Sequence, residues 1–438
     1  MNRRDFMAAG TAALFTHAEA AAQPAGASGL RLAARNAWLW GLPLIEMAGQ
    51  RAARSTQGLK VNTLHHQRAL VGAKDQFVTT PNNDTLYSQA WLNLEKGPVT
   101  VSVPASGDRY YCVPLMDMYT NNFAIVGTRT SGSAARTFTI VGPHDRSDAP
   151  QVIRSPTDWV WLLGRTLVEG EDDLAKAHAF QDGWTISGPE ADAPKSFAKR
   201  ASPWDEYFAS VQALMNESPP PVTDARMLDS MAPLIRLGAR FDPQHYSADQ
   251  VADIRAGMAD ALVLLRQVRN SALVHNGWTF PRYSLGDFGQ DYIYRTAVAI
   301  GGLAALPRVE AMYLRAAGED GGGFDSARSW RLTFAADQLP PVDSFWSLSM
   351  YRLAPAGQLF FTENPISRYA IGDRTAGLKR GSDGSFEIWM SRTEPTSNPN
   401  ANWLPAPADD KFVLILRAYL PRSSLIEGSY LPPAVQAV

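Results

Sequence analysis

Short segments in which apolar and polar residues alternate recur in two parts of the chain, each bounded by turn residues. Residues 99–103 read Val-Thr-Val-Ser-Val, and residues 86–94 also alternate. Side chains two apart share one face of a strand. Further segments of this kind are residues 109–116, 123–126, 138–141, 151–154, 330–334, 344–351, 358–361, 385–391 and 411–419. Several short strands at a spacing of roughly 8–12 residues are typical of a β-sandwich or barrel. We therefore expect a mainly β protein with an antiparallel β-sandwich or barrel in each of these two parts.

Helical periodicity marks the beginning and the middle of the chain. Residues 31–54 carry an apolar stripe at helical spacing, and Pro43 is expected to kink or divide that helix. We also expect helices at residues 156–178 and 292–306. Residues 203–280 have helical patterns that are broken by three consecutive prolines at 219–221.

These patterns predict an α+β architecture in which helical insertions accompany the sandwiches. The expected boundaries are an N-terminal β-sandwich domain at residues 31–180, a mostly helical connecting segment at 181–290 and a C-terminal β-sandwich domain at 291–438. Asp383-Gly384 indicates a tight turn of hairpin type.

The first residues have the features of an export signal. Arg3 and Arg4 precede a short apolar run and an Ala-x-Ala site, which is typical of a twin-arginine signal peptide at residues 1–22. Residues 23–30 are small and rich in Pro, Gly and Ala, and we interpret them as a linker. No later stretch reaches about 18 uninterrupted apolar residues, so no transmembrane segment is expected in the mature chain. The predicted location is the periplasm or the medium.

Charge and cysteine content exclude several classes of function. The chain has 41 basic and 43 acidic residues, a net charge of -2, and no basic stripe, so a nucleic-acid partner is not expected. Cys112 is the single cysteine, which rules out an intramolecular disulfide and a cysteine-rich metal site. We interpret Cys112 as a small core residue. The nucleophile elbow, the P-loop, the zinc-protease helix motif and the dinucleotide fingerprint are all absent from the sequence.

Two long motifs are specific enough to indicate a family. Residues 80–88 read Thr-Pro-Asn-Asn-Asp-Thr-Leu-Tyr-Ser, and residues 339–351 read Leu-Pro-Pro-Val-Asp-Ser-Phe-Trp-Ser-Leu-Ser-Met-Tyr. Gly-Asp-Arg-Tyr-Tyr at 107–111, Asp-Met-Tyr-Thr-Asn-Asn-Phe at 117–123 and Asn-Trp-Leu-Pro-Ala-Pro at 402–407 accompany them. With these motifs the chain resembles the bacterial family that combines domain of unknown function 1254 with domain of unknown function 1214. The resemblance runs from about residue 33 to 437 and implies two jelly-roll-like domains with helical insertions, but no substrate.

One step of the family pattern, Asn-x-x-x-His, is matched here by Asn62 and His66. The chain departs from the pattern at residues 318–323, where a Gly-rich stretch replaces the family's usual hairpin.

Polar residues of the first motif region form the candidate site. The run at 81–85 is a turn by composition, but turn chemistry alone leaves Tyr87, on the polar face of the following strand, unexplained. We hypothesise that Asp84, Tyr87, Arg109, Asp117 and Asn121 converge on one cavity with His66 at its rim. A structural ion pair between Arg109 and Asp117 is the alternative. The assigned roles are catalytic for Asp84, His66 and Tyr87, and substrate-binding for Asn62, Asn83, Arg109, Asp117, Tyr119, Asn121, Trp346 and Arg368.

Three kinds of function fit this set of residues. The leading hypothesis is an exported, hydrolase-type enzyme that acts on a small organic molecule through a carboxylate–histidine pair. A non-catalytic periplasmic ligand-binding or envelope-associated protein is the second. The third is a metal-dependent enzyme with Asp84, Asp117 and His66 as ligands, although the leading hypothesis assigns no metal ligand. The cofactor is left open, and a homo-oligomer is expected from the resemblance and from the large aromatic residues.

Overall fold

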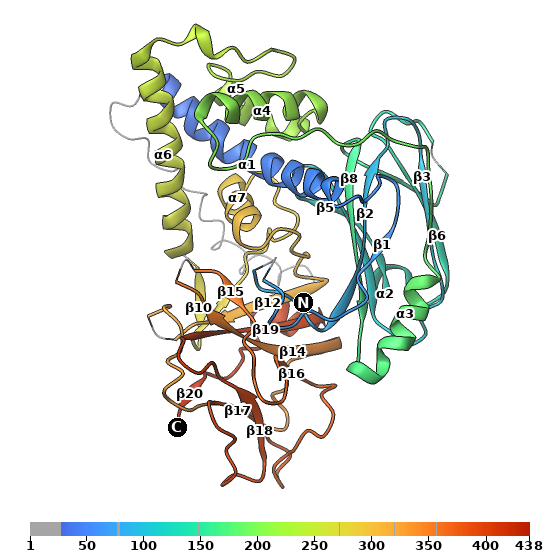
Figure 1. Ribbon diagram of the computed structural model, residues 1–438, viewed down its shortest axis with the longest axis vertical. Helices are drawn as coiled ribbons and strands as arrows, with labels where there is room; N and C mark the ends of the chain where they lie inside the picture. Colours follow the sequence, from blue (N-terminus) through green and yellow to red (C-terminus); the bar gives the residue numbers. More distant parts are fainter. Residues whose placement is uncertain (1–27, 77–78, 148, 271, 319, 356) are drawn as a thin grey trace, which may run out of the picture.

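The computed structural model describes residues 28–438 apart from 77–78, 148, 271, 319 and 356. The expected signal peptide and most of the expected linker therefore lie outside the described residues. Among the described residues, two β-rich domains flank a layer of helices (Figure 1). The fold is α+β, as expected.

The first domain is a sandwich of two sheets whose inner faces bury one apolar core, which includes Leu92, Val101 and Leu162. A short helical turn, α2 (Thr128–Ser131), and α3 (Leu174–Asp182) both lie near the lower end of this domain in Figure 1. One sheet contains, in order, β1 (His65–His66), β2 (Thr85–Asn93), β8 (Trp159–Leu167), β4 (Tyr111–Met116) and β5 (Asn122–Gly127). The other contains β7 (Val152–Arg154), β6 (Arg136–Val141), β3 (Val99–Val103) and β9 (Thr185–Ser187).

The second domain also packs two sheets on one core, which includes Leu348, Ile388 and Leu416. Its larger sheet contains β10 (Leu273–His275), β11 (Trp278–Phe280), β12 (Ala311–Ala316), β19 (Phe412–Pro421), β14 (Val342–Leu353), β15 (Leu359–Phe360) and β16 (Ala370–Gly372). Its smaller sheet contains β18 (Ala401–Pro405), β17 (Phe386–Ser391), β13 (Trp330–Phe334) and β20 (Gln436–Ala437). The last helix, α8 (Ser423–Ile426), follows β19.

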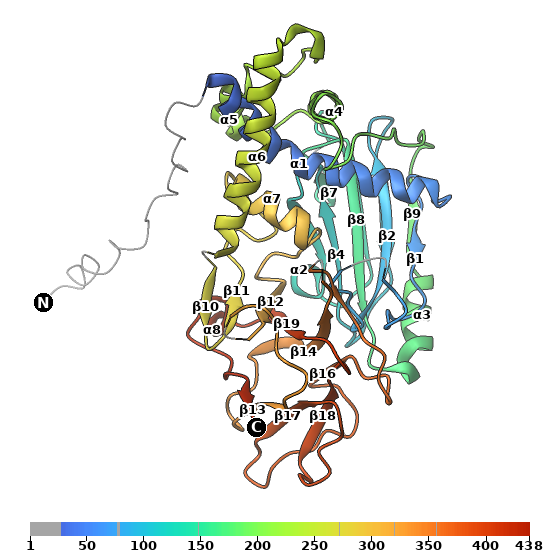
Figure 2. The same ribbon diagram turned by 60° about the vertical axis from the view of Figure 1, so that its left-hand side comes forward.

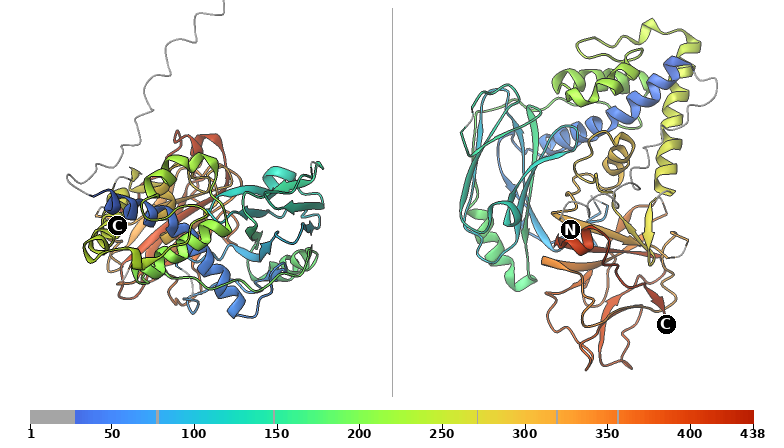
Figure 3. Two further views of the ribbon diagram at one scale, coloured as in Figure 1. Left: turned by 90° about the horizontal axis from the view of Figure 1, so that it is seen from above. Right: turned by 180° about the vertical axis from the view of Figure 1, so that it is seen from behind.

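The helical layer is built around α1 (Gly29–Thr56), which begins at the N-cap Ser28 and buries Trp40 and Leu44. A Cβ on Gly257 would lie 2.2 Å from the Arg31 carbonyl oxygen, so only glycine permits the close crossing of α1 and α6. The partners of α1 are α4 (Trp204–Glu217), α5 (Ala225–Met231), α6 (Ala248–Asn270) and α7 (Tyr292–Gly301). Figure 2 shows α1 crossing the first domain beside α7, and Figure 3 shows the first sandwich standing to one side of both.

Most expected elements are confirmed, and one is wrong. Residues 156–178, expected to be helical, contain β8, and α3 begins only at Leu174. All nine residues of β8 are buried, so the strand shows no polar–apolar alternation. A short apolar run cannot be assigned to strand or helix by periodicity alone.

Three finer expectations also need correction. Helix α1 continues through Pro43 and is not divided there. The sandwiches are not purely antiparallel, because β6 pairs with β7, and β17 with β18, in parallel. Asp383-Gly384 does form a turn, with Gly384 at φ 80°, but the two strands around it, β16 and β17, belong to different sheets.

The expected boundaries fall inside continuous structural units. Strand β9 pairs with β3, so the first sandwich extends past residue 180. Strands β10 and β11, within the segment expected to be helical, join the large sheet of the second domain. The first residues of α1, Gly29 and Leu30, occupy the end of the expected linker.

Candidate functional site

Two buried arginines, one from each domain, mark the candidate site. Arg165 is 4% exposed near the C-terminal end of β8, and Arg417 is 3% exposed in the middle of β19. Arginine is rarely buried without partners that balance its charge. Both arginines lie within electrostatic range of Tyr313 and Tyr419. We call the group where the two domains meet the interdomain seam, and it comprises Asp84, Tyr87, Arg165, Tyr313, Arg417 and Tyr419.

Arg417 is held by several oxygen atoms. Its Nη1 donates to Ser349 Oγ at 2.7 Å, and its Nη2 donates to the Thr80 and Pro81 carbonyls at 3.2 and 3.3 Å. Burial lowers the pKa of Arg417, but the neighbouring Tyr351, Tyr419 and Asp84 outweigh that effect and raise it. Arg417 therefore fastens the turn that precedes β2 to the second domain.

Arg165 is less completely satisfied. Its Nη1 donates to the Leu163 carbonyl at 3.2 Å and its Nη2 to the Ala304 carbonyl at 2.9 Å, but its buried Nε has no partner among the described residues. The guanidinium lies over the Tyr87 ring at 5.4 Å. Burial lowers the pKa of Arg165, and Tyr87, Tyr313, Cys112 and Tyr419 together raise it above its usual value. The side chain is thus a cation with one donor left over.

Asp84 joins the two domains directly. Its backbone N–H donates to Asn82 Oδ1 at 2.8 Å, which closes the expected turn. Its Oδ2 accepts a hydrogen bond of 2.6 Å from Ser347 Oγ in β14 of the second domain. Asn82 Nδ2 donates to the Tyr419 hydroxyl at 2.8 Å. The first motif therefore docks onto the second domain, and Asn82 serves the seam rather than the neighbouring Asn83.

The polar groups at the seam are mostly donors. Tyr87 and Tyr313 are half-buried, and neither hydroxyl has a hydrogen-bond partner among the described residues. Burial raises the pKa of Tyr313 to about 12 against the opposing effect of Arg165, so this phenol stays protonated at neutral pH. Two free phenols beside a guanidinium suit an anionic or strongly polarised oxygen.

Asp117, Tyr119 and Asn121 lie at the opposite end of the same sheet. The Val168 N–H donates to the Asp84 carbonyl, whereas Met116 pairs with Trp161. Seven strand steps from Trp161 to Val168 correspond to about 23 Å. The structure does not bring Asp84 and Asp117 around one cavity.

The Asp117 turn satisfies its own carboxylate. Asp117 Oδ1 accepts from the Tyr119 and Asn121 N–H groups, both at 2.9 Å, and Oδ2 accepts from Asn121 Nδ2 at 3.3 Å. Burial raises the pKa of Asp117 to about 6, although these hydrogen bonds and the charge of Arg295 oppose the rise. The Tyr119 hydroxyl donates to the Ser218 carbonyl, and Asn121 Oδ1 accepts from the Phe288 N–H. This turn anchors the helical layer and the connecting loops.

His66 and Arg109 each have other partners than expected. His66 Nδ1 lies 2.8 Å from Ser88 Oγ, and because His66 pairs with Ser88 its side chain leaves the sheet on the opposite face from Tyr87. Burial lowers its pKa, with Arg68 acting in the same direction. Arg109 forms a bidentate pair with Asp173, at 2.6 and 2.7 Å, and not with Asp117.

The remaining sequence candidates are mainly structural. Asn62 donates to the Asn93 and Pro189 carbonyls and accepts from the Asn93 N–H. Asn83 has a buried Oδ1 without a partner among the described residues. Trp346 packs between Phe334 and Phe386 in the second core. Arg368 donates to the Trp403 carbonyl at 3.0 Å.

Of the predicted residues, only Asp84 and Tyr87 reach the seam. The other seam residues, Arg165, Tyr313, Arg417 and Tyr419, were missed. A signal existed for the arginines, since each is the one charged residue of an otherwise apolar strand. Within the described residues no three His, Cys, Asp or Glu side chains gather as metal ligands would, and Asp84, Asp117 and His66 do not meet.

A known family model matches each of the two domains. The family "Protein of unknown function (DUF1254)" matches residues 61–188, and "Protein of unknown function (DUF1214)" matches residues 310–423. The crystal structure of the VPA0106 protein from Vibrio parahaemolyticus has a TM-score of 0.70 at 23% identity, covering 94% of this chain and 100% of that one. At this identity the similarity shows the fold alone.

An uncharacterised protein from Burkholderia cenocepacia matches at a TM-score of 0.42 and 11% identity, over 94% of this chain and 87% of its own. No curated protein matches the chain. In the part of the chain that the structure describes, no helix is both long and apolar enough to cross a bilayer.

Proposed function

We propose, from the premise that this chain belongs to the family that joins DUF1254 to DUF1214, that its interdomain seam binds a small organic molecule through an anionic or strongly polarised oxygen. The observation that carries the proposal is the free Nε of Arg165, buried beside the half-buried phenols of Tyr87 and Tyr313. A buried donor without a partner is unfavourable by about 1–3 kcal/mol, and a bound oxygen would remove that penalty.

The seam favours binding over acid–base catalysis by a carboxylate–histidine pair. His66 contacts Ser88, and the Asp84 carboxylate contacts Ser347, so no such pair is formed. The donors around Arg165 would instead orient a ligand oxygen and exclude ligands that present only donors. Organic acids, esters and other carbonyl compounds match this requirement.

The test is mass spectrometry of the small molecules that co-purify with the native protein. We expect an oxygen-rich anion or carbonyl compound with the wild type. Arg165→Met should weaken its binding about 10- to 100-fold, because a hydrogen bond to a charged group contributes about 1.5–3 kcal/mol. Arg109→Met is the matched control, since it removes an arginine of the same domain outside the seam. Equal retention of the molecule by Arg165→Met would refute the proposal.

Hydrolysis is a second candidate because of one contact, the 2.6 Å hydrogen bond from Ser347 Oγ to Asp84. Asp84 would accept the hydroxyl proton while Oγ attacks a carbonyl carbon, and the departing alcohol or amine would take that proton as its bond to the carbon breaks. A water molecule would then hydrolyse the acyl-serine to release the acid and restore the hydroxyl. Arg417 lies opposite Ser347 in the β14–β19 ladder and would stabilise the oxyanion. Ser347 is 1% exposed, so this reaction requires the seam to open.

A panel of esters and amides tests the second candidate. If hydrolysis occurs at the seam, Ser347→Ala and Asp84→Asn should each reduce kcat at least about 100-fold. Ser391→Ala, a buried serine of β17 in the smaller sheet of the second domain, is the control. Turnover that survives Ser347→Ala would exclude this mechanism and leave binding as the function.

Export and self-association are proposals that rest on the sequence alone. The twin arginines at 3–4 and the Ala-x-Ala site support a periplasmic location. In fractionated cells we expect the wild type in the periplasm. The double variant Arg3→Lys/Arg4→Lys should instead remain in the cytoplasm. Light scattering of the purified mature chain measures its molar mass, which tests the proposed homo-oligomer directly.

A further inference from the structure

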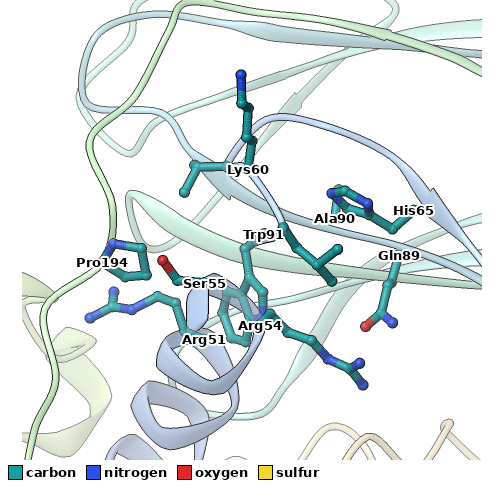
Figure 4. Close-up of a pocket in the computed structure, with 11 residues that line it drawn as sticks. Arg51, Arg54, Ser55, Lys60, His65, Gln89, Ala90, Trp91 and Pro194 are labelled. Carbon is teal, nitrogen blue, oxygen red and sulfur yellow. The ribbon is translucent and has the colours of Figure 1, made fainter. Parts of the chain in front are cut away.

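A small pocket lies between the C-terminal end of α1 and strands β1 and β2, apart from the seam residues (Figure 4). Eleven residues line it, and none is Asp or Glu. The polar lining consists mainly of Arg51, Arg54, Lys60, His65, Gln89 and Trp91. Figure 4 shows Arg54 extending toward Gln89 and His65, with Arg51 on the other side of Trp91. The pocket is therefore basic on more than one side.

Several donors at the pocket have no partner. The Arg51 side chain is fully buried, and its Nη2 donates to Glu217 at 2.9 Å, but its Nε and Nη1 have no partner within the described residues. The same holds for His65 Nε2, Trp91 Nε1 and Gln89 Oε1. Such unsatisfied groups require an explanation, for which a bound water or ion is the usual one. Rotation of the Gln89 amide would add one more donor.

The pKa shifts of the basic residues at the pocket also favour a bound anion. Burial lowers the pKa of Arg51, against the effect of Glu217, and burial also lowers the pKa of Arg54. Burial lowers the pKa of His65, and the charge of Arg54 lowers it further. The α1 C-terminus accounts for a cation such as Arg54 in the last turn. It does not account for the unpaired donors of Arg51, which lies one turn earlier.

The size of the pocket limits what it can hold. Its empty space is about 300 Å³ including the open mouth, but only about 10 Å³ accepts the centre of a water-sized sphere. That is room for about one water molecule. A single compact group can enter, while the rest of a larger ligand would have to lie outside. One oxygen of a carboxylate fits this space, and the rest of that group would lie in the open mouth of the pocket.

We infer that this pocket is an anion site that takes one oxygen of a carboxylate group, with Arg51, Arg54 and Trp91 as the donors around it. The site shares no residue with the interdomain seam, so it stands or falls independently of the proposed function. The carboxylate belongs either to a free small acid or to the C-terminus of a peptide.

The experiment is a calorimetric titration of the whole mature chain at constant ionic strength. The probes are acetate, chloride, a pentapeptide with a free C-terminus and the same pentapeptide as its amide. We expect saturable binding of acetate or of the free-acid peptide, and weaker or no binding of chloride and the amide. A free-acid peptide that binds more tightly than acetate identifies a chain terminus as the source, and equal affinities identify a free acid.

Two variants tie the binding to the pocket. Arg54→Gln should weaken carboxylate binding at least 10-fold without unfolding the chain, because the Arg54 side chain is only partly buried and lies in the last turn of α1 (Figure 4). Arg266→Gln on exposed α6 is the control for lost charge and should bind as the wild type does. No saturable carboxylate binding by the wild type, equal responses to acetate and chloride, or equal weakening in Arg266→Gln would each overturn the inference.

Discussion

Asp84 and Asp117 lie in turns at the two ends of one sheet, and both turns are rich in Asn and Asp. The Asp117 carboxylate is used by its own turn, since both oxygens accept hydrogen bonds from residues 119 and 121. The Asp84 carboxylate instead accepts from Ser347 of the other domain. The two turns are similar in composition, but their carboxylates have different partners.

This difference in partners shows when the carboxylate of a polar turn can take part in function. A carboxylate whose lone pairs are filled by local N–H groups is scaffold, whatever its sequence context. A carboxylate that faces another domain takes part in whatever assembles there. Asp84 therefore belongs to the candidate site and Asp117 does not.

The largest expected effect comes from removing the scaffold carboxylate. Asp117→Ala leaves two N–H groups of the turn without an acceptor and removes one of the two carboxylates near Arg295, the other being Asp224, so we expect a loss of about 3–5 kcal/mol in the free energy of unfolding. Urea unfolding measures it. Asp117→Asn keeps one acceptor and should lose clearly less. If Asp117→Ala lost less free energy of unfolding than Asp84→Ala, the comparison of the two turns would be reversed.

The pH dependence of stability sharpens the same contrast. The pKa of Asp117 rises to about 6 on folding, so the folded chain binds this proton more tightly than the unfolded chain. Its contribution is fully present below about pH 4 and is lost as the pH rises through 6, a change of up to about 3 kcal/mol.

Urea midpoints of the wild type and Asp117→Asn between pH 4 and 7.5 test this effect. As the pH falls, the urea midpoint of the wild type should rise relative to that of Asp117→Asn. A difference that does not change with pH would show that Asp117 does not titrate in this range.

The contact between domains has a smaller expected energy. A double-mutant cycle with Asp84→Ala and Ser347→Ala should give a coupling of about 2 kcal/mol, as for a buried hydrogen bond to a charged group. A cycle of Asp117→Ala with Ser347→Ala is the control and should give a coupling near zero. Coupling in the control cycle would mean that the two ends of the sheet are not independent.

The smallest effect is expected at Arg109. Its bidentate pair with Asp173 is about one-eighth exposed on both sides, at 14% and 12%, and lies within the first domain. A cycle of Arg109→Met with Asp173→Ala should give about 1 kcal/mol. A coupling as large as that of Asp84 with Ser347 would show that cross-domain and local pairs are equivalent here.

Much of the fold could be predicted from the sequence, because local patterns decide it. Residues 99–103 and 330–334 alternate clearly, and both strands begin and end where expected. Strand β8 was not predicted, because it is buried on both faces and lacks the alternation of polar and apolar residues on which the prediction depends.

The candidate site was less predictable. The sequence motif identified Asp84 and Tyr87, since turn chemistry and strand alternation are local. Arg165 and Arg417 lie in different domains, and their shared environment of Tyr313 and Tyr419 exists only after the domains dock. A lone arginine within each of two apolar strands was the available sign, but it does not reveal which strands will face each other.

The position of α1 has a consequence for how the chain is made. Among the described elements this helix is synthesised first, yet its apolar side is covered by α4, α5, α6 and α7, the last of which ends at Gly301. Most of the protein must therefore be synthesised before the first helix finds its final neighbours. Until then its tryptophans are open to chaperones, so nascent chains stalled before residue 301 should be trapped by them and complete chains released.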